Sequence, residues 1–180
     1  GKAKGKATIE QLGFVIENGR LIERMVASER LRRELALAAN VQQRLFPAHP
    51  PEVSHLELAG FCQPARGVGG DYYDFVPMDH DDVGIVIADV AGKGISAALL
   101  MASVQSSLHA QLKVPGNGGL SSATLVARLN RQLYESTPPE KYATFYCGLY
   151  DDQNGLLAYT NAGHLAPILI RRQDVLRLES

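Results

Sequence analysis

The pattern of apolar and polar residues predicts one long helix near the start of the chain, from Thr8 to Phe46, with Asn18-Gly19 as the place where it could break. Beyond Arg20 this stretch holds neither glycine nor proline until Pro47, which cannot continue a helix. Positions spaced four and three residues apart form an apolar seam with one polar member: Leu31, Leu35, Ala38, Gln42 and Leu45.

Two interpretations of this seam stay open. It fits an ordinary amphipathic helix packed on its own domain. It also fits a signalling helix that continues from an upstream sensor domain and pairs with a second copy of the chain. The seam is short for a coiled coil and contains Gln42. Because the helix is longer than a domain of this size needs, we expect a homodimer. We expect Leu45-Phe46-Pro47 to pack against the domain that follows.

After the proline-rich stretch Pro47–Pro51, the apolar pattern becomes that of strands and two shorter helices. The predicted strands are Leu56–Gln63, Tyr72–Pro77, Val83–Val90, Ala143–Tyr150, Leu156–Asn161, Ala166–Arg171 and Val175–Leu178. The predicted helices are Gly94–Leu112 and Ala123–Glu135. Strands therefore come in hairpin-like runs with two consecutive helices between them. This order indicates an α+β layered fold with a mainly antiparallel sheet rather than alternating βαβ units.

Two carboxylate-bearing turns flank the most apolar strand. Asp71 follows the glycine-rich Gly67–Gly70, and Asp89 stands near the end of Val83–Val90, just before Gly92-Lys93-Gly94. A strand fixes a carboxylate, and glycines let the backbone approach a ligand. Two such acids on one sheet could share a cation such as Mg²⁺ or Mn²⁺, which prefer oxygen ligands. Turn capping by aspartate is the alternative, and spacing alone does not decide between them.

Two neighbouring features do not join this candidate site. Strand alternation places Asp74 on the opposite face from Asp71. The stretch Ala91-Gly92-Lys93-Gly94 is similar to a phosphate-binding P-loop, but that motif requires glycine six residues before its lysine and serine or threonine after it. Ile87 and Gly94 occupy those positions, so a P-loop is excluded.

Composition narrows the class of protein. The 180 residues are 46% hydrophobic, which suffices for one well-buried domain and is too little for two large ones. A net charge of -1 gives no general reason to expect nucleic-acid binding. The two cysteines, Cys62 and Cys147, fit reduced, buried thiols. No apolar run approaches membrane-spanning length and no secretory signal is evident, so we expect a cytoplasmic protein.

Several motifs occur together and in one order along the chain. They are VQQRLFP (Val41–Pro47), PARGVGGDYYDF (Pro64–Phe75), IADVAGKGISAALLMA (Ile87–Ala102), ATFYCGLYD (Ala143–Asp151) and NAGHLAPIL (Asn161–Leu169). In this combination the chain resembles the SpoIIE/RsbU branch of the PPM-type metal-dependent serine/threonine protein phosphatases, from about Arg30 to its end.

The resemblance implies an α-β-β-α sandwich of two antiparallel sheets flanked by helix pairs. Residues 1–46 would form a helical linker, and residues 47–180 would form the phosphatase domain. It implies two Mn²⁺ or Mg²⁺ ions, with Asp71 and Asp89 as metal ligands, Asp89 bridging, and the carbonyl of Val90 adding an oxygen. Arg66 stands where the wider superfamily has a phosphate-binding arginine; a solvated loop arginine is the alternative.

The implied activity is hydrolysis of phosphoserine or phosphothreonine by metal-activated water. The implied substrate is a STAS-type anti-sigma factor antagonist. Ala91 stands where the superfamily often has a histidine that protonates the leaving group, and His164 is either a substitute acid or, as we expect, a turn-stabilising residue. The resemblance also implies a Thr-Asp-Gly turn and a late aspartate, which this chain lacks, so we expect an incomplete domain. The alternative function is a catalytically incomplete binding or signal-relay module.

Overall fold

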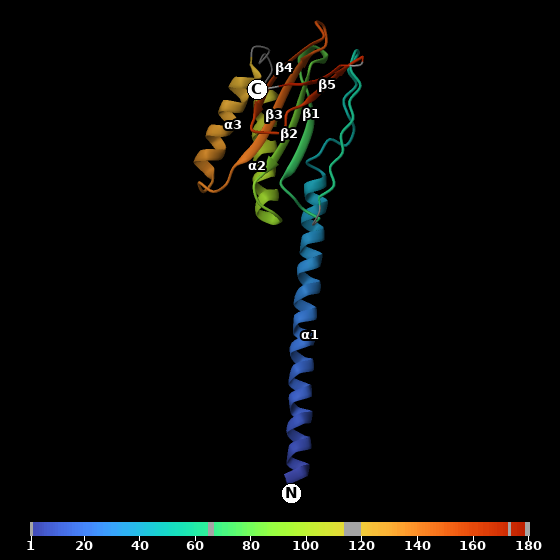
Figure 1. Cartoon of the computed structure of the whole chain (residues 1–180), viewed down its shortest axis with the longest axis vertical. Helices are drawn as coiled ribbons and strands as arrows, with labels where there is room; N and C mark the ends of the chain where they lie inside the picture. The colour runs from blue at the N-terminus through green and yellow to red at the C-terminus, as the bar shows by residue number, and fades with distance from the viewer. Residues whose placement is uncertain (1, 65–66, 114–119, 173, 179–180) are drawn as a thin grey trace. The chain divides into compact units, whose positions relative to one another are not determined.

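The computed structural model describes residues 2–64, 67–113, 120–172 and 174–178, and the side chains of residues 2–12 and 80 are not described. The chain divides into two compact units, Gly1–Ala38 and Ala39–Ser180. The first unit consists of most of helix α1 (Lys2–Gln43), drawn in blue in Figure 1. This helix is continuous through Asn18-Gly19, so the break considered there does not occur.

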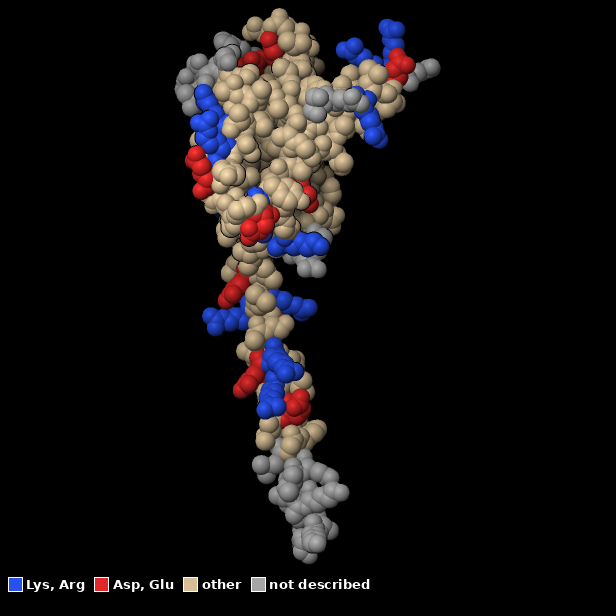
Figure 2. Space-filling model, turned by 60° about the vertical axis from the view of Figure 1, so that its left-hand side comes forward, with Lys and Arg blue, Asp and Glu red and all other residues tan. Residues whose placement is uncertain are grey.

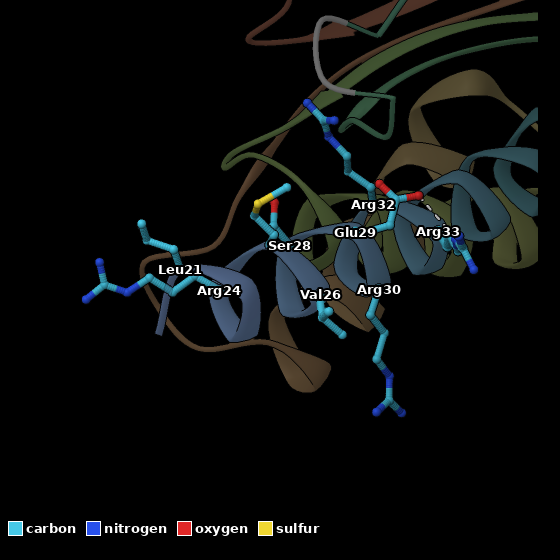
Figure 3. Close-up of a pocket in the computed structure, with 9 residues that line it drawn as sticks. Leu21, Arg24, Val26, Ser28, Glu29, Arg30, Arg32 and Arg33 are labelled. Carbon is cyan, nitrogen blue, oxygen red and sulfur yellow. Dashed lines mark hydrogen bonds and ion pairs between the residues drawn. The ribbon is translucent and has the colours of Figure 1, made fainter. Parts of the chain in front are cut away.

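The first unit exposes large apolar side chains between charged ones. Those of Phe14, Met25 and Val26 are each more than 60% exposed. Figure 3 shows the stretch from Leu21 to Arg33, whose side chains border an open depression of about 770 Å³. Within it Glu29 accepts a hydrogen bond from Arg33 at 3.2 Å, a spacing of one helical turn.

A four-stranded antiparallel sheet forms the second unit's centre, in the order β1-β2-β3-β4. The strands are β1 (Asp71–Pro77), β2 (Val83–Val90), β3 (Ala143–Asp151) and β4 (Leu156–Ala162). A separate two-stranded sheet pairs β5 (Ile168–Arg171) with β6 (Asp174–Arg177). A 3-10 turn, η1 (Asp79–Asp81), joins β1 to β2. Both sheets are antiparallel, as predicted.

Two helices cover one face of the larger sheet (Figure 1). Helix α2 (Ile95–Leu112) lies against β1 and β2, and α3 (Ser122–Ser136) lies against β3 and β4. The core between them follows strand alternation, since every second strand residue points toward the helices. Its fully buried members include Val76, Val86, Cys147, Met101, Leu108 and Leu125. The Ser121 side chain caps α3 by accepting from the amide of Thr124 at 3.1 Å.

The second unit includes the end of α1, which packs on this core as predicted. Leu45 and Phe46 are half-buried against the core cluster. The Phe46 ring lies 6.1 Å from the ring of Tyr72 and 5.6 Å from that of Tyr73, between centroids. Figure 2 shows that residues other than lysine, arginine, aspartate and glutamate cover most of the visible surface of this unit.

Two expectations about the fold need correction or narrowing. The strand predicted over Leu56–Gln63 is wrong: only an isolated bridge between Val53 and Leu56 forms there. This segment finds no ladder partner among the described residues, and a side-chain bond from the Tyr73 hydroxyl to the carbonyl of Gly60, at 3.1 Å, holds it instead. A complete two-sheet sandwich is not shown, because the second sheet has only β5 and β6.

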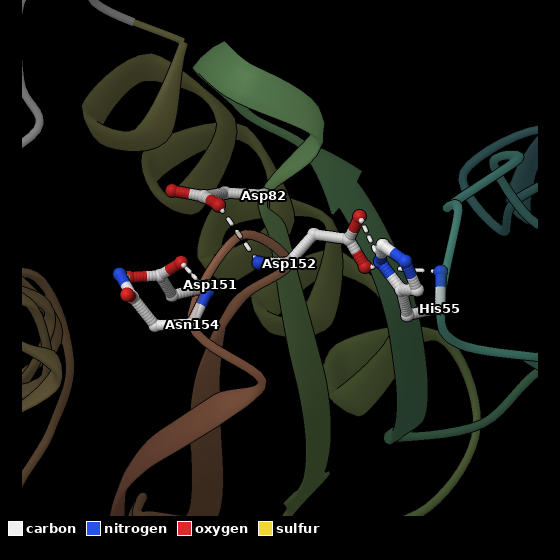
Figure 4. A network of polar contacts seen from close by, with 5 residues as sticks. All are labelled: His55, Asp82, Asp151, Asp152 and Asn154. Carbon is white, nitrogen blue, oxygen red and sulfur yellow. Dashed lines mark hydrogen bonds and ion pairs between the residues drawn. The ribbon is translucent and has the colours of Figure 1, made fainter.

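A polar network joins His55, which directly precedes Leu56–Gln63, to Asp152, which directly follows β3 (Figure 4). Asp152, which is buried, accepts from the backbone amide of His55 at 3.1 Å and contacts the His55 ring at 3.1 Å. Its own amide donates to the Asp82 side chain at 3.1 Å. Because Asp82 precedes β2, this network lies at the opposite end of that strand from Asp89.

Candidate active site

Asp71 and Asp89 stand directly opposite each other on adjacent antiparallel strands. Asp71 opens β1 and Asp89 lies next to the end of β2, so the register brings together two turns that are 18 residues apart in the sequence (89 minus 71). Both acids line one pocket of about 440 Å³ with glycines of the two turns. The two candidate carboxylates therefore lie on adjacent strands of one sheet and line one pocket.

The electrostatics of the pair favour a bound cation. The pKa of Asp89 is raised, first by partial burial, then by the negative charge of Asp71 and a side-chain hydrogen bond with it, while His164 lowers it in part. Two adjacent carboxylates repel each other when both are ionised, and a divalent cation between them would remove that repulsion. Oxygen donors of this kind suit Mg²⁺ or Mn²⁺. Within the described residues, no histidine, cysteine or further acid joins Asp71 and Asp89 to make a metal-binding cluster of three.

Gln42, near the end of α1, holds the turn that leads into Asp71. Its side-chain Nε2 donates to the carbonyl of Gly69 at 2.7 Å, and its Oε1 accepts from the amide of Gly69 at 3.1 Å. The side chain is buried, so both bonds form away from bulk water. Sequence reasoning placed Gln42 in the apolar seam and missed this role. A polar residue at a seam position was the only available signal.

The backbones of the two turns also meet directly. The amide of Val90 donates to the carbonyl of Gly70 at 3.2 Å. The carbonyl oxygen of Val90 lies so close to Gly70 that a β-carbon there would collide with it, which explains glycine at this position. The backbone pairing thus continues one residue pair beyond Asp71 and Asp89. It fixes the distance between the two strands where they carry the carboxylates.

Asp74 lies on the other face of the sheet, as alternation predicted. It is buried and accepts hydrogen bonds from the Tyr72 hydroxyl at 2.5 Å and from the amide of Phe75 at 2.8 Å. The His109 ring on α2 contacts it at 2.5 Å. Burial and the neighbouring carboxylate raise the pKa of Tyr72. This network joins β1 to α2 and supports the strand that carries Asp71.

His164 has two separable contacts beside the acid pair. Its backbone closes a turn with the Asn161 side chain, which accepts from the amide of His164 at 2.9 Å and donates to its carbonyl at 3.0 Å. Its ring contacts the hydroxyl of Thr144 at 2.8 Å, and Thr144 is the cross-strand neighbour of Asp89. The turn is present, but the Asn161 side chain stabilises it, and the His164 ring contacts Thr144 instead. Arg66 lies outside the described residues.

Residues 79–180 match the family described as Stage II sporulation protein E (SpoIIE), over more than half of the chain. The chain belongs to this family. Two curated relatives of this SpoIIE-family chain are named as phosphoserine phosphatases of Bacillus subtilis. RsbU is 32% identical over 136 residues, which cover 76% of this chain and 39% of RsbU. RsbP is 29% identical over 137 residues, which cover 74% of this chain and 33% of RsbP.

The fold also matches solved structures. The SiaA-PP2C domain of Pseudomonas aeruginosa has a TM-score of 0.61, with 19% identity over 76% of this chain and 54% of that one. The α+β arrangement of this SpoIIE-family chain is therefore that of PP2C-type domains. The chain spans well under half the length of RsbU and of RsbP. No helix among the described residues has the length and apolar character needed to span a membrane.

Proposed function

We propose that this chain carries part of a metal-dependent protein phosphatase that removes phosphate from phosphoserine or phosphothreonine on a regulatory protein. The observation behind this proposal is the direct opposition of Asp71 and Asp89 in one pocket, in a chain related to phosphoserine phosphatases. A STAS-type anti-sigma factor antagonist is the proposed substrate, since family resemblance favours a small phosphorylated regulator.

Asp71, Asp89 and the carbonyl of Val90 would hold the metal, with Asp89 shared between two ions. The family is generally metal-dependent, and the carboxylate pair fits hard divalent cations such as Mn²⁺ or Mg²⁺. When bound, such ions activate water and neutralise phosphoryl charge. The chain's own contribution is positional: the ladder between β1 and β2 fixes the carboxylates, and Gln42 fixes the turn before Asp71. Arg66 would hold a phosphate oxygen pair through its planar guanidinium.

A second function, signal relay through α1, is favoured by a separate observation. The part of α1 in the first unit exposes many large apolar side chains, which an isolated helix in water has little reason to do. A second copy of the chain would cover them, and an upstream sensor domain would act through the same helix. The bond from Gln42 to Gly69 offers a route from the end of α1 to the acid pair.

The test uses the longer protein of which we propose this chain is a part, called the parent protein below. It is mixed with a phosphorylated STAS-domain protein and Mn²⁺. We expect release of inorganic phosphate that stops when the metal is chelated and returns when Mn²⁺ is restored. Phosphate release that is insensitive to chelation contradicts the metal-dependent reaction. Absence of release from any phosphoserine or phosphothreonine protein, with Mn²⁺ binding intact, favours the binding and relay module instead.

A further inference from the structure

Two lysines meet at the turn that follows Asp89, although they are far apart in the sequence. Lys93 follows β2 in the turn that leads to α2, and it lines the same pocket as Asp71 and Asp89. Lys141 precedes β3, and its Nζ lies over Gly92, 3.3 Å from the position a β-carbon would take there. Glycine at this position, with φ +125°, leaves the room that the ammonium group occupies.

A backbone bond joins the Lys141 segment to the turn after β2: the amide of Ala91 donates to the carbonyl of Tyr142 at 2.8 Å. Within the segment, the amide of Lys141 donates to the carbonyl of Pro138 at 2.9 Å. Lys141 is half-buried, whereas Lys93 is exposed. The backbone of Lys141 is therefore fixed beside the turn that carries Lys93.

No acid among the described residues forms an ion pair with either ammonium. Among the residues that the structure describes, the ion pairs are those of Arg30, Arg33, His55 and His109, and none includes Lys93 or Lys141. Partial burial of a charge without a partner is unfavourable unless a ligand supplies the opposite charge. Lys93 lines the pocket of the acid pair and the Lys141 ammonium lies over Gly92, which lines the same pocket, so two positive charges are available to an anion that enters it.

We propose that Lys93 and Lys141 bind the phosphoryl oxygens of a phosphate monoester and position the phosphate group beside Asp71 and Asp89. The inference rests on the proposed function and assigns it a substrate contact. A phosphate group suits this place because its oxygens accept hydrogen bonds from ammonium groups and also coordinate hard cations. The step is binding alone, with no bond made or broken.

Lys93 lies in the glycine-rich stretch Ala91–Gly94, which is similar to a P-loop but lacks its spacing. In a P-loop, backbone amides of one glycine-rich loop surround the phosphates and a lysine of that loop completes the site. Here Lys93 comes from such a loop, and the second cation comes from the chain before β3. The site is therefore assembled from two separate segments, which no single short motif can reveal.

The experiment compares Lys93→Gln, Lys141→Gln and the double variant of the parent protein, with Lys113→Gln as a matched control. Lys113 is exposed at the C-cap of α2, the end opposite the pocket, so this change removes the same charge elsewhere. With Mn²⁺ present, KM for p-nitrophenyl phosphate and the inhibition constant of inorganic phosphate are measured. A lost charge-assisted hydrogen bond predicts roughly a tenfold rise in both for Lys141→Gln, with no change for Lys113→Gln.

A second readout does not require turnover. Exposed and half-exposed lysines of the Mn²⁺-loaded parent are acetylated with and without inorganic phosphate, and the labelled positions are found by mass spectrometry. We expect phosphate to protect Lys93 and Lys141 but not Lys113. If the parent lacks phosphatase activity but these lysines are protected, the proposed function fails and the phosphate site stands. If neither lysine is protected, or if all three variants keep the wild-type KM and phosphate inhibition, the lysine proposal is overturned.

Discussion

The side chain of Gln42 satisfies both backbone polar groups of Gly69, donating to its carbonyl at 2.7 Å and accepting from its amide at 3.1 Å. Gly69 stands two residues before Asp71, so the last turn of α1 and the first ligand candidate share one short connection. These two bonds therefore couple the position of the helix end to the turn that leads into Asp71.

Replacing Gln42 with alanine is expected to weaken both the fold and the site. The change leaves a part-buried amide and carbonyl of Gly69 without their side-chain partner, which costs at most about 1–3 kcal/mol per unsatisfied group. Chemical denaturation measures the loss in free energy of unfolding, and Mn²⁺ titration measures the loss in metal affinity. Gln43→Ala is the matched control, because Gln43 is the exposed neighbour on the same helix. Equal behaviour of the two variants would show that the bonds to Gly69 contribute nothing.

Asp89 gives the metal-free chain a defined dependence on pH. Its folded-state pKa is raised above the ordinary value of 3.8 by partial burial and by Asp71, so the folded form holds the proton more tightly than the unfolded form. Stability is therefore lost as the pH rises through this range, and the loss persists at neutral pH. In chelator, Asp89→Asn should raise Tm at pH 7, by on the order of a degree or two because the pair is solvent-exposed.

The gain should vanish at a pH well below 3.8, where residue 89 of the wild type is protonated in both the folded and the unfolded state. Thermal unfolding followed by circular dichroism at the two pH values measures it. Asp79→Asn serves as control, since Asp79 is exposed in η1, away from the pair. A lower Tm for Asp89→Asn at pH 7 without metal would contradict repulsion between the two carboxylates.

The network around Asp152 is expected to stabilise the fold without affecting the site. A double-mutant cycle with His55→Ala and Asp152→Ala should give a coupling free energy of about 1 kcal/mol, because the His55 ring contacts a buried carboxylate. The backbone amide of residue 55 also donates to Asp152, but alanine keeps this amide, so it does not enter the coupling. Unfolding in urea supplies the four free energies. Additive effects of the two changes on the free energy of unfolding would mean that His55 and Asp152 are not coupled. Altered Mn²⁺ affinity would mean that the network at one end of β2 affects the acid pair at the other end.

Self-association through α1 is tested by placing charge in its seam. Leu31 is more than half exposed. We expect the Leu31→Lys and Leu35→Lys double variant to dissociate a dimer because it introduces like charges into an apolar contact. Sedimentation measures the mass, and circular dichroism confirms that the second unit stays folded. A wild-type chain that is already monomeric at high micromolar concentration rules out the pairing.

The sequence predicts those parts of the site that local pattern determines. The apolar run of β2, the turn at Asp79–Asp82 and the strand predicted over Tyr72–Pro77 together indicate an antiparallel hairpin, and the hairpin places Asp71 opposite Asp89. Alternation likewise places Asp74 on the buried face. Register along two adjacent strands follows from sequence because every residue takes part in it.

Contacts between distant elements could not be predicted in this way. The bond from Gln42 to Gly69 joins residues 27 apart, and that from His109 to Asp74 joins residues 35 apart. Each depends on how a helix packs, which no local pattern encodes. Leu56–Gln63 shows the reverse error, since a strand-like pattern does not make a strand without a partner for its backbone amides.

Metal-dependent phosphatase activity of the parent protein carrying Asp89→Asn tests the central claim most directly. The amide keeps the size of the carboxylate but removes the charge that would hold two cations, so the change should affect chemistry more than packing. At saturating Mn²⁺, with a phosphorylated STAS-domain protein as substrate, the account predicts phosphate release by the wild type and none above background by the variant, with unchanged circular dichroism. Turnover by the variant close to that of the wild type would contradict the assignment of Asp89 as a metal ligand.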